Sequence, residues 1–254
     1  MTLDLFARPA LLFLPANRER AVARARESKA DLVVLDLEDA VKVEDKESAR
    51  EAVTAAVSMP WEMPVGIRVN AGSRDDLDIA LKSTCDFIVM PKVERPFEPV
   101  AKPMLAMIET ATGVINAAAI AQSVAGIIVG TNDLAASLKL PRLARESMGF
   151  ALQSCVMAAR AAGIAIFDGV YNRLDDPDGL GRECAEGHAL GFDGKSLIHP
   201  DQIASCQQAF APSDVELARA ERLVSAASGG AQRFEGEMIE DLHVAAARRL
   251  LARA

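Results

Sequence analysis

Short apolar runs recur along the chain, and a polar residue closes or follows most of them. The runs are continuous rather than alternating, which is typical of strands that are buried on both faces of a parallel sheet. We predict strands at LLFLPA (11–16), LVVLDLE (32–38), VGIRVN (65–70), FIVMPK (87–92), MLAMIE (104–109), GIIVG (126–130), IAIFDGV (164–170) and KSLIHP (195–200).

Amphipathic stretches rich in Ala, Arg and Glu separate most of these runs and predict helices, as in NRERAVARARESKA at 17–30. Strands that alternate with helices indicate parallel βαβ units. Roughly eight units in a chain of this length predict an α/β fold of the (β/α)8 class, a TIM barrel. A doubly wound open sheet is the alternative. The segment VERPFEPVAK after Lys92 contains two prolines, so we expect its helix to be short or absent.

The tail has a different pattern. DVELARAERLVSAAS predicts a helix from about residue 214, a Gly-Gly pair interrupts it, and 237–253 predicts a second helix. The pattern indicates no linker and no repeat. We therefore expect a single TIM-barrel domain over 1–254, with 213–254 as a C-terminal helical extension.

Composition narrows the class of protein. Half of the 254 residues are hydrophobic but only 4% are aromatic, so the predicted core is aliphatic. The net charge of −8 argues against a nucleic-acid partner. The four Cys form no CxxC pair, which favours reduced thiols, and the apolar run ALLFLP at 10–15 is too short to span a bilayer. We expect a soluble, cytoplasmic protein without a membrane partner.

Active sites of TIM barrels lie at the carboxyl ends of the strands, so polar residues that end the predicted strands converge on one face. They are Asn17, Asp36, Glu38, Asp39, Arg68, Asn70, Lys92, Glu109, Asp133 and Asp168. Glu109 and Asp133 end adjacent strands and suit Mg²⁺, which takes one or two carboxylates and leaves its other positions to water and substrate oxygens. The three His lack ligand spacing, which argues against zinc.

Simpler explanations stay open for these residues. Asp133 or Thr131 would serve equally as the cap of a following helix, and so would Thr110 or Thr112. Arg68 is either a fork for a substrate carboxylate or a buried ion pair. Gly130, like Gly113 and Gly169, serves a turn or lets the backbone approach a ligand.

Eight stretches occur in a characteristic order from about Leu11 to Pro200, with a weaker one near the tail. They are LFLPANRER, VVLDLEDAV, IRVN, FIVMPKVE, AMIETATGV, GTNDLA, FDGVYNRLDD and GFDGKSLIHP, followed by RFEGEMIEDLH. With this set the chain resembles the citrate lyase β-subunit family, the CoA-ester lyases of the HpcH/HpaI aldolase group.

The resemblance implies a Mg²⁺-dependent carbon–carbon lyase that acts on a 3-hydroxyacyl-CoA thioester of the citryl-, malyl- or citramalyl-CoA type. Its products would be an acyl-CoA and a 2-keto acid such as oxaloacetate, glyoxylate or pyruvate. It also implies a homo-oligomer, a trimer or a hexamer. The sequence does not distinguish among these thioesters and keto acids, or a free CoA ester from a carrier-bound one.

The resemblance implies a role for individual residues. Glu109 and Asp133 would bind the metal and Arg68 the substrate carboxylate, while Glu38 and Asp39 would act as catalytic residues that orient water. We also expect Gly130, Thr131 and Asn132, which precede Asp133 in the motif, to contact the substrate. His199 is expected to be structural.

The tail departs from the family pattern. Relatives carry MID followed one residue later by Pro, whereas this chain reads MIEDLH, with Glu240 in place of Asp. The resemblance to malyl-CoA and citramalyl-CoA lyases implies that this Asp acts as an acid or base from a neighbouring subunit, so we expect Glu240 to be catalytic across a subunit interface, with weak or altered activity. Two alternatives remain, a class II pyruvate-type aldolase without CoA and a non-catalytic relative that binds keto acid or CoA.

The phosphates of a CoA ester require cations at the barrel mouth. Arg18, Lys42 and Lys46 follow the first two predicted strands and are the candidates. The alternative is that all three are solvated surface charges.

Overall fold

Eight parallel strands close into a barrel. The computed structural model describes residues 3–98, 100–141 and 145–252. The strands are β1 (Ala10–Pro15), β2 (Leu32–Asp36), β3 (Val65–Arg68), β4 (Phe87–Met90), β5 (Met104–Ile108), β6 (Gly126–Val129), β7 (Ala165–Asp168) and β8 (Gly194–Leu197). Each pairs with the next, and β8 pairs with β1, with Leu12 opposite Leu197. The predicted (β/α)8 barrel is confirmed.

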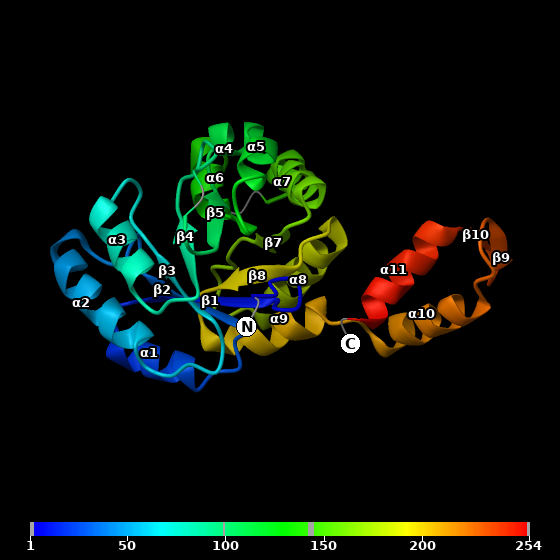
Figure 1. Cartoon of the computed structure of the whole chain (residues 1–254), viewed down its shortest axis with the longest axis horizontal. Coiled ribbons are helices and arrows are strands. Elements are labelled where there is room, and N and C mark those ends of the chain that lie inside the picture. Colours follow the sequence, from blue (N-terminus) through cyan, green and yellow to red (C-terminus); the bar gives the residue numbers. More distant parts are fainter. Residues whose placement is uncertain (1–2, 99, 142–144, 253–254) are drawn as a thin grey trace. The chain divides into compact units, whose positions relative to one another are not determined.

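Helices follow the strands and lie outside the ring, as Figure 1 shows. They are α1 (Glu19–Arg26), α2 (Lys46–Val57), α3 (Arg74–Lys82), α4 (Ala111–Ile115), α5 (Ala117–Ala121), α6 (Thr131–Ser137), α7 (Gly149–Ala162), α8 (Pro177–Leu190) and α9 (Ile203–Phe210). Short 3₁₀ turns occur at Val43–Asp45, Arg145–Met148 and Pro200–Gln202. Between β4 and β5 the described residues, all but Pro99, form no helix, as the two prolines predict.

Two phenylalanines fill much of the barrel interior. Phe87 and Phe167 are fully buried and pack with aliphatic side chains from the other strands. Gly66 makes room for one of them, because a Cβ at this position would lie 2.5 Å from Cδ2 of Phe87. Burying a side chain of this size contributes about 1.5–3 kcal/mol, so the few aromatic residues matter strongly to the core.

The chain from Phe210 onward forms a compact unit of its own. It contains α10 (Asp214–Ala226), the hairpin of β9 (Gln232–Phe234) and β10 (Glu237–Ile239), and α11 (Asp241–Leu251). Its small core consists of Ala220, Leu223, Ile239, Val244 and Ala247.

The prediction of a helix over 237–253 is wrong at its start. Glu237–Ile239 pairs with β9 as a strand, and α11 begins only at Asp241. Glu235 and Gly236 have φ values of 47° and 89°, the pair of positive values that a tight hairpin turn requires. Residue 253 lies outside the described residues.

No helix in the described part of the chain is both long and apolar enough to cross a membrane. The four cysteines are buried and free of disulfides.

Candidate active site

The register of β2 and β3 sets Asp36 directly beside Arg68. Both side chains are buried, and Nε and Nη2 of Arg68 donate to the two carboxylate oxygens of Asp36 at 2.6 and 2.5 Å. The guanidinium also lies over the ring of Phe13, 5.4 Å from its centroid. Burial lowers the pKa of Arg68, but Asp36 outweighs it and holds that pKa above its usual value.

The ion-pair alternative is supported, because Asp36 binds one edge of Arg68 and Glu38 lies against Nη1. This Nη1 atom lies 3.0 Å from Oε2 of Glu38 and 3.7 Å from the sulfur of Met107. Arg68 also lines the barrel-mouth cavity described below. Its role as a fork for a substrate carboxylate stays a prediction.

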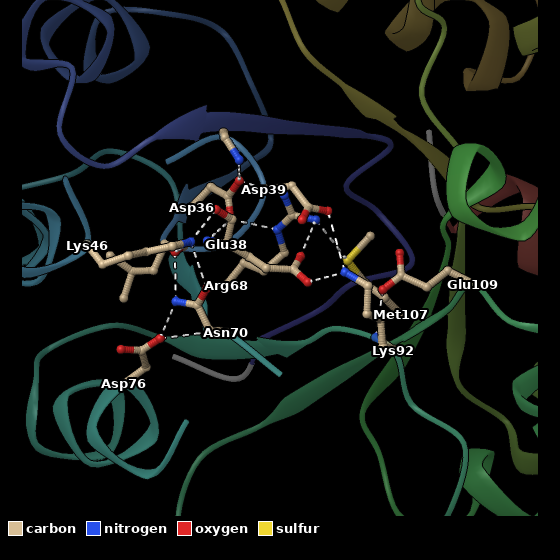
Figure 2. Close-up of polar contacts among 12 residues, drawn as sticks. Asp36, Glu38, Asp39, Lys46, Arg68, Asn70, Asp76, Lys92, Met107 and Glu109 are labelled. Atoms are coloured by element: carbon tan, nitrogen blue, oxygen red, sulfur yellow. Dashed lines mark hydrogen bonds and ion pairs between the residues drawn. The ribbon is translucent and has the colours of Figure 1, made fainter. Parts of the chain in front are cut away.

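Glu38 and Lys92 form a second pair, shown in Figure 2. Nζ of Lys92 donates to Oε1 of Glu38 at 2.6 Å and lies 3.7 Å from a carboxylate oxygen of Asp39. Burial raises the pKa of Glu38 above its usual value, although Arg68 and Lys92 oppose that shift. Asp39 is more than half exposed.

Glu109 follows β5 and is 1% exposed. Its Oε1 accepts a hydrogen bond of 2.6 Å from the backbone N–H of Lys92. Burial, together with repulsion from Glu38 and Asp133, raises the pKa of Glu109 to about 7, against the opposing influence of the Lys92 N–H and Arg68. The carboxylate thus lies in a crowded acidic site that a cation would relieve.

The turn from β6 into α6 brings the second carboxylate. A Cβ at Gly130 would lie 2.6 Å from Cβ of Glu109, so only glycine lets this turn approach the glutamate so closely. Thr131 is buried, and the amide of Asn132 exchanges hydrogen bonds of 3.2 and 2.7 Å with the amide of Asn172. Among the described residues, neither a hydrogen bond nor an ion pair engages the Asp133 carboxylate.

The alternative that these residues cap helices is correct for Thr110 and wrong for Thr131 and Asp133. Oγ1 of Thr110 accepts from the N–H of Gly113 and caps α4. At α6, Thr131 and Asp133 lie inside the first turn and Gly130 precedes the helix without a side-chain cap. Helix capping therefore does not account for Asp133.

These side chains meet at a cavity of about 410 Å³ at the carboxyl ends of the strands. It is lined by Phe13, Leu14, Pro15, Asp36, Asp39, Ala40, Arg68, Met107, Glu109, Val129, Gly130, Thr131, Asn132, Asp133, Val170, Asn172, Ser196 and Ile198. Most of the site residues predicted on the barrel are among them. Glu38 stands apart from this lining and holds Arg68 and Lys92 instead.

Other polar residues at strand ends serve the scaffold. Asp168 is fully buried and binds Arg145 and Lys195, at 2.9 Å in each case. Lys46 donates to the carbonyl oxygens of Leu37 and Glu38 and to Oδ1 of Asn70, at 2.6–2.7 Å. The expectation that Lys46 binds a phosphate is wrong, because its three donors are already in use.

Two features of the cavity escaped the sequence analysis. Asp36 was one of ten polar strand ends, and its pairing with Arg68 requires the register of β2 and β3. Ser196 lines the cavity with a buried Oγ that has no hydrogen-bond partner among the described residues, and nothing in KSLIHP indicates this. His199 precedes a 3₁₀ turn, where its Nδ1 accepts from the N–H of Asp201 at 3.2 Å.

Glu240 belongs to the C-terminal unit. It is exposed and directly precedes α11, and its N–H donates to Nδ1 of His243 at 2.9 Å. Its catalytic role stays a prediction.

The fold and cavity define a TIM barrel with an acidic pocket at the carboxyl ends of its strands. Residues 9–200 match the model of the HpcH/HpaI aldolase/citrate lyase family. The chain belongs to this family.

Individual relatives match over nearly the whole chain. The chain is 39% identical to the (3S)-malyl-CoA thioesterase of Cereibacter sphaeroides strain KD131, over 96% of this chain and 93% of the relative. It is 31% identical to the citrate lyase subunit beta of Escherichia coli, over 97% and 93%.

Solved structures of relatives have the same fold as this chain. Protein CitE of Mycobacterium tuberculosis in complex with magnesium, acetoacetate and coenzyme A is 32% identical, with a TM-score of 0.87 over 98% of this chain and 99% of that one. The citrate lyase beta subunit of the same organism, in complex with oxaloacetate and magnesium, has a TM-score of 0.74 at 31% identity, over 83% of this chain and all of that one.

Proposed function

We propose that the protein is a Mg²⁺-dependent carbon–carbon lyase. Its substrate would be a 3-hydroxyacyl-CoA thioester of the malyl, citryl or citramalyl type, which it cleaves to an acyl-CoA and a 2-keto acid. The observation that carries the proposal is the single cavity that Glu109, Asp133 and Arg68 line together. Relatives with the same fold bind magnesium, coenzyme A and oxaloacetate, which supports it.

The residues present fit Mg²⁺. Glu109 uses only Oε1 in its hydrogen bond to Lys92, and no hydrogen bond or ion pair in the described structure engages Asp133. Two carboxylates with water and substrate oxygens are the ligands that Mg²⁺ prefers. The described residues contain no group of three or more His, Cys, Asp or Glu side chains placed to hold a metal. Substrate and water would therefore complete the coordination.

We propose the following roles for the protein's residues in cleavage. Arg68 would bind the substrate carboxylate, and Gly130, Thr131 and Asn132 would contact the substrate beside it. A base removes the hydroxyl proton, the carbon–carbon bond breaks, and its electron pair passes to the thioester as an enolate that is then protonated on carbon. Bound Mg²⁺ would supply Lewis-acid polarisation of the substrate oxygens. Glu240 is the proposed base, with Glu38 and Asp39 orienting water.

Hydrolysis of the thioester is the second candidate. Four relatives at 38–39% identity carry the name (3S)-malyl-CoA thioesterase, a higher identity than to the citrate lyase subunits quoted above. The same cavity would serve both reactions, which differ in the bond that breaks.

Analysis of the products of malyl-CoA separates these functions. With Mg²⁺ present, a lyase yields acetyl-CoA and glyoxylate, whereas a thioesterase yields malate and free CoA thiol. Citryl- and citramalyl-CoA, assayed in parallel, identify the preferred thioester. Binding without turnover of any ester would favour the non-catalytic relative, and cleavage of a CoA-free hydroxy acid would favour the pyruvate-type aldolase.

We also propose a cytoplasmic homo-oligomer, a trimer or a hexamer, that acts as one TIM-barrel domain with a C-terminal extension. Four free cysteines are consistent with a reducing compartment. Sedimentation analysis tests the assembly, and fractionation of cells that express the protein tests the location.

A further inference from the structure

Lys92 has an unusual backbone for a residue with a side chain. Its φ is 52°, in the left-handed region, and it lies just beyond the end of β4. This conformation is unfavourable for residues with a Cβ, and glycine would adopt it at less cost. A lysine held in it at the mouth of the barrel points to a requirement that glycine cannot meet.

The strained conformation directs the two ends of Lys92 to two different acids. Its N–H donates to Oε1 of Glu109 and its Nζ to Oε1 of Glu38, each at 2.6 Å. Figure 2 shows Lys92 between these two glutamates. The backbone contact needs only the turn, which glycine would also provide. The second contact needs the ammonium group.

These contacts divide the acids into two groups. Lys92 binds Oε1 of Glu109 and leaves Oε2, which lies against Gly130 at the turn that carries Asp133. Glu38, by contrast, has Lys92 on Oε1 and Arg68 3.0 Å from Oε2. Without its ammonium partner, Glu38 would be a further carboxylate able to turn toward Glu109 and Asp133, because it is near enough to repel Glu109 already.

We propose that Lys92 is a positioning residue that keeps the divalent-cation site to two protein carboxylates. Its backbone N–H orients Glu109 toward the cation, and its ammonium group binds Glu38 and keeps it from the cation. The remaining coordination positions would then stay open to the oxo acid. This inference rests on the proposed function, in that the cavity must take a divalent cation.

The test measures binding of Mn²⁺ alone by titration calorimetry, slightly above neutral pH, and then binding of oxaloacetate at saturating Mn²⁺. Lys92→Met removes a positive charge near the cation and frees Glu38. We expect Mn²⁺ to bind about tenfold more tightly and the oxo acid about tenfold more weakly. A merely structural role would weaken both.

Matched variants complete the design. Lys92→Arg keeps the charge and should stay near the wild type, as should Lys82→Met, which removes an exposed lysine. Lys92→Gly relieves the backbone and keeps the N–H, so it should behave like Lys92→Met, and it replaces that variant if the latter fails to fold.

Weaker or unchanged Mn²⁺ binding in both Lys92→Met and Lys92→Gly would overturn the inference. Tighter Mn²⁺ binding in Lys92→Met but not in Lys92→Gly would also overturn it. Glu109→Gln distinguishes an error in the proposed cation site from an error in the role of Lys92. If that variant keeps wild-type Mn²⁺ affinity, the proposed cation site itself is wrong. If it loses Mn²⁺ while the Lys92 variants match the wild type, only the role of Lys92 is wrong.

Discussion

At the scale of single residues, neighbouring acids at the barrel mouth have different tasks because their partners differ. Asp36 accepts hydrogen bonds from Arg68, and Glu38 accepts one from Lys92, at 2.5–2.6 Å. Glu109 keeps one oxygen free of hydrogen bonds within the described structure, and Asp133 keeps both. Glu109 and Asp133 are therefore better suited to a cation than Asp36 and Glu38.

Glu109→Gln or Asp133→Asn should lower Mg²⁺ affinity by on the order of a hundredfold, because each removes one of two anionic ligands. Glu109→Gln should not destabilise the apoprotein, since it replaces a buried, crowded carboxylate by a neutral amide. Calorimetric titration with Mg²⁺ and urea unfolding provide the two measurements. Glu51→Gln, on the exposed face of α2, is the control. Retained Mg²⁺ affinity in both variants would locate the cation elsewhere.

Arg68→Lys keeps the charge but loses the planar fork. We expect keto-acid binding in the presence of Mg²⁺ to weaken by about 1.5–3 kcal/mol, the usual worth of hydrogen bonds to a charged group. Stability should fall as well, because the paired contact with Asp36 is lost. Arg182→Lys, on the exposed face of α8, is the control. A loss of stability with unchanged keto-acid affinity would show that Arg68 is only an ion pair.

The sequence predicted that polar residues at strand ends gather at the barrel mouth, and five of the ten, Asp36, Asp39, Arg68, Glu109 and Asp133, line the cavity there. It was not sufficient to predict how they pair. Asp168 and Glu109 both end apolar runs, yet Asp168 meets Arg145 and Lys195, which lie far from it in the chain. Such partners depend on strand register and on helix placement, which local patterns do not specify.

At the scale of elements, one buried ionic network ties two strands to a neighbouring helix and a 3₁₀ turn. Lys195 on β8 is fully buried and binds Asp168 on β7 and Glu183 on α8, at 2.9 and 2.6 Å. Arg145, in the turn before α7, adds a paired contact to Asp168. The network adds side-chain contacts to the backbone pairing of β7 with β8 and joins α8 and the 3₁₀ turn to it.

Asp168→Asn should destabilise the protein by about 3–5 kcal/mol, because it leaves Lys195 and Arg145 with less compensating charge in a buried site. Urea unfolding measures the effect. Asp78→Asn, which removes an exposed pair with Lys82, should change stability by less than about 0.5 kcal/mol. A similar small change in Asp168→Asn would show that the network is dispensable.

The same network makes a prediction about acid. Burial raises the pKa of Asp168, but Lys195 and Arg145 outweigh burial and hold that pKa below its usual value. The carboxylate therefore stabilises the fold fully above the ordinary Asp pKa of about 4 and loses this effect as pH falls through its lower folded value. Unfolding of the Asp168→Asn variant should depend less on pH in that acidic range than unfolding of the wild type.

At the scale of the whole molecule, the barrel carries the proposed cation and acid-binding groups, and the C-terminal unit carries Glu240. Cleavage requires a proton acceptor for the substrate hydroxyl. Glu109 and Asp133 would be occupied by the cation, and Arg68 remains protonated. Glu38 is held by Lys92 and Arg68. Glu240, an exposed carboxylate at the position where the family pattern is expected to have Asp, is the acceptor we propose, supplied by a neighbouring subunit of an oligomer.

Glu240→Ala should reduce turnover by about a hundredfold or more while Mg²⁺ and keto-acid affinities stay near those of the wild type, because the group acts on a proton rather than in binding. Glu221→Ala, on the exposed face of α10, is the control. Supply across subunits predicts complementation. Glu240→Ala and Glu109→Gln chains, each nearly inactive alone, should regain activity when denatured together and refolded, since mixed oligomers contain sites with both intact groups. A monomer in sedimentation analysis, or mixed oligomers without activity, would contradict this arrangement.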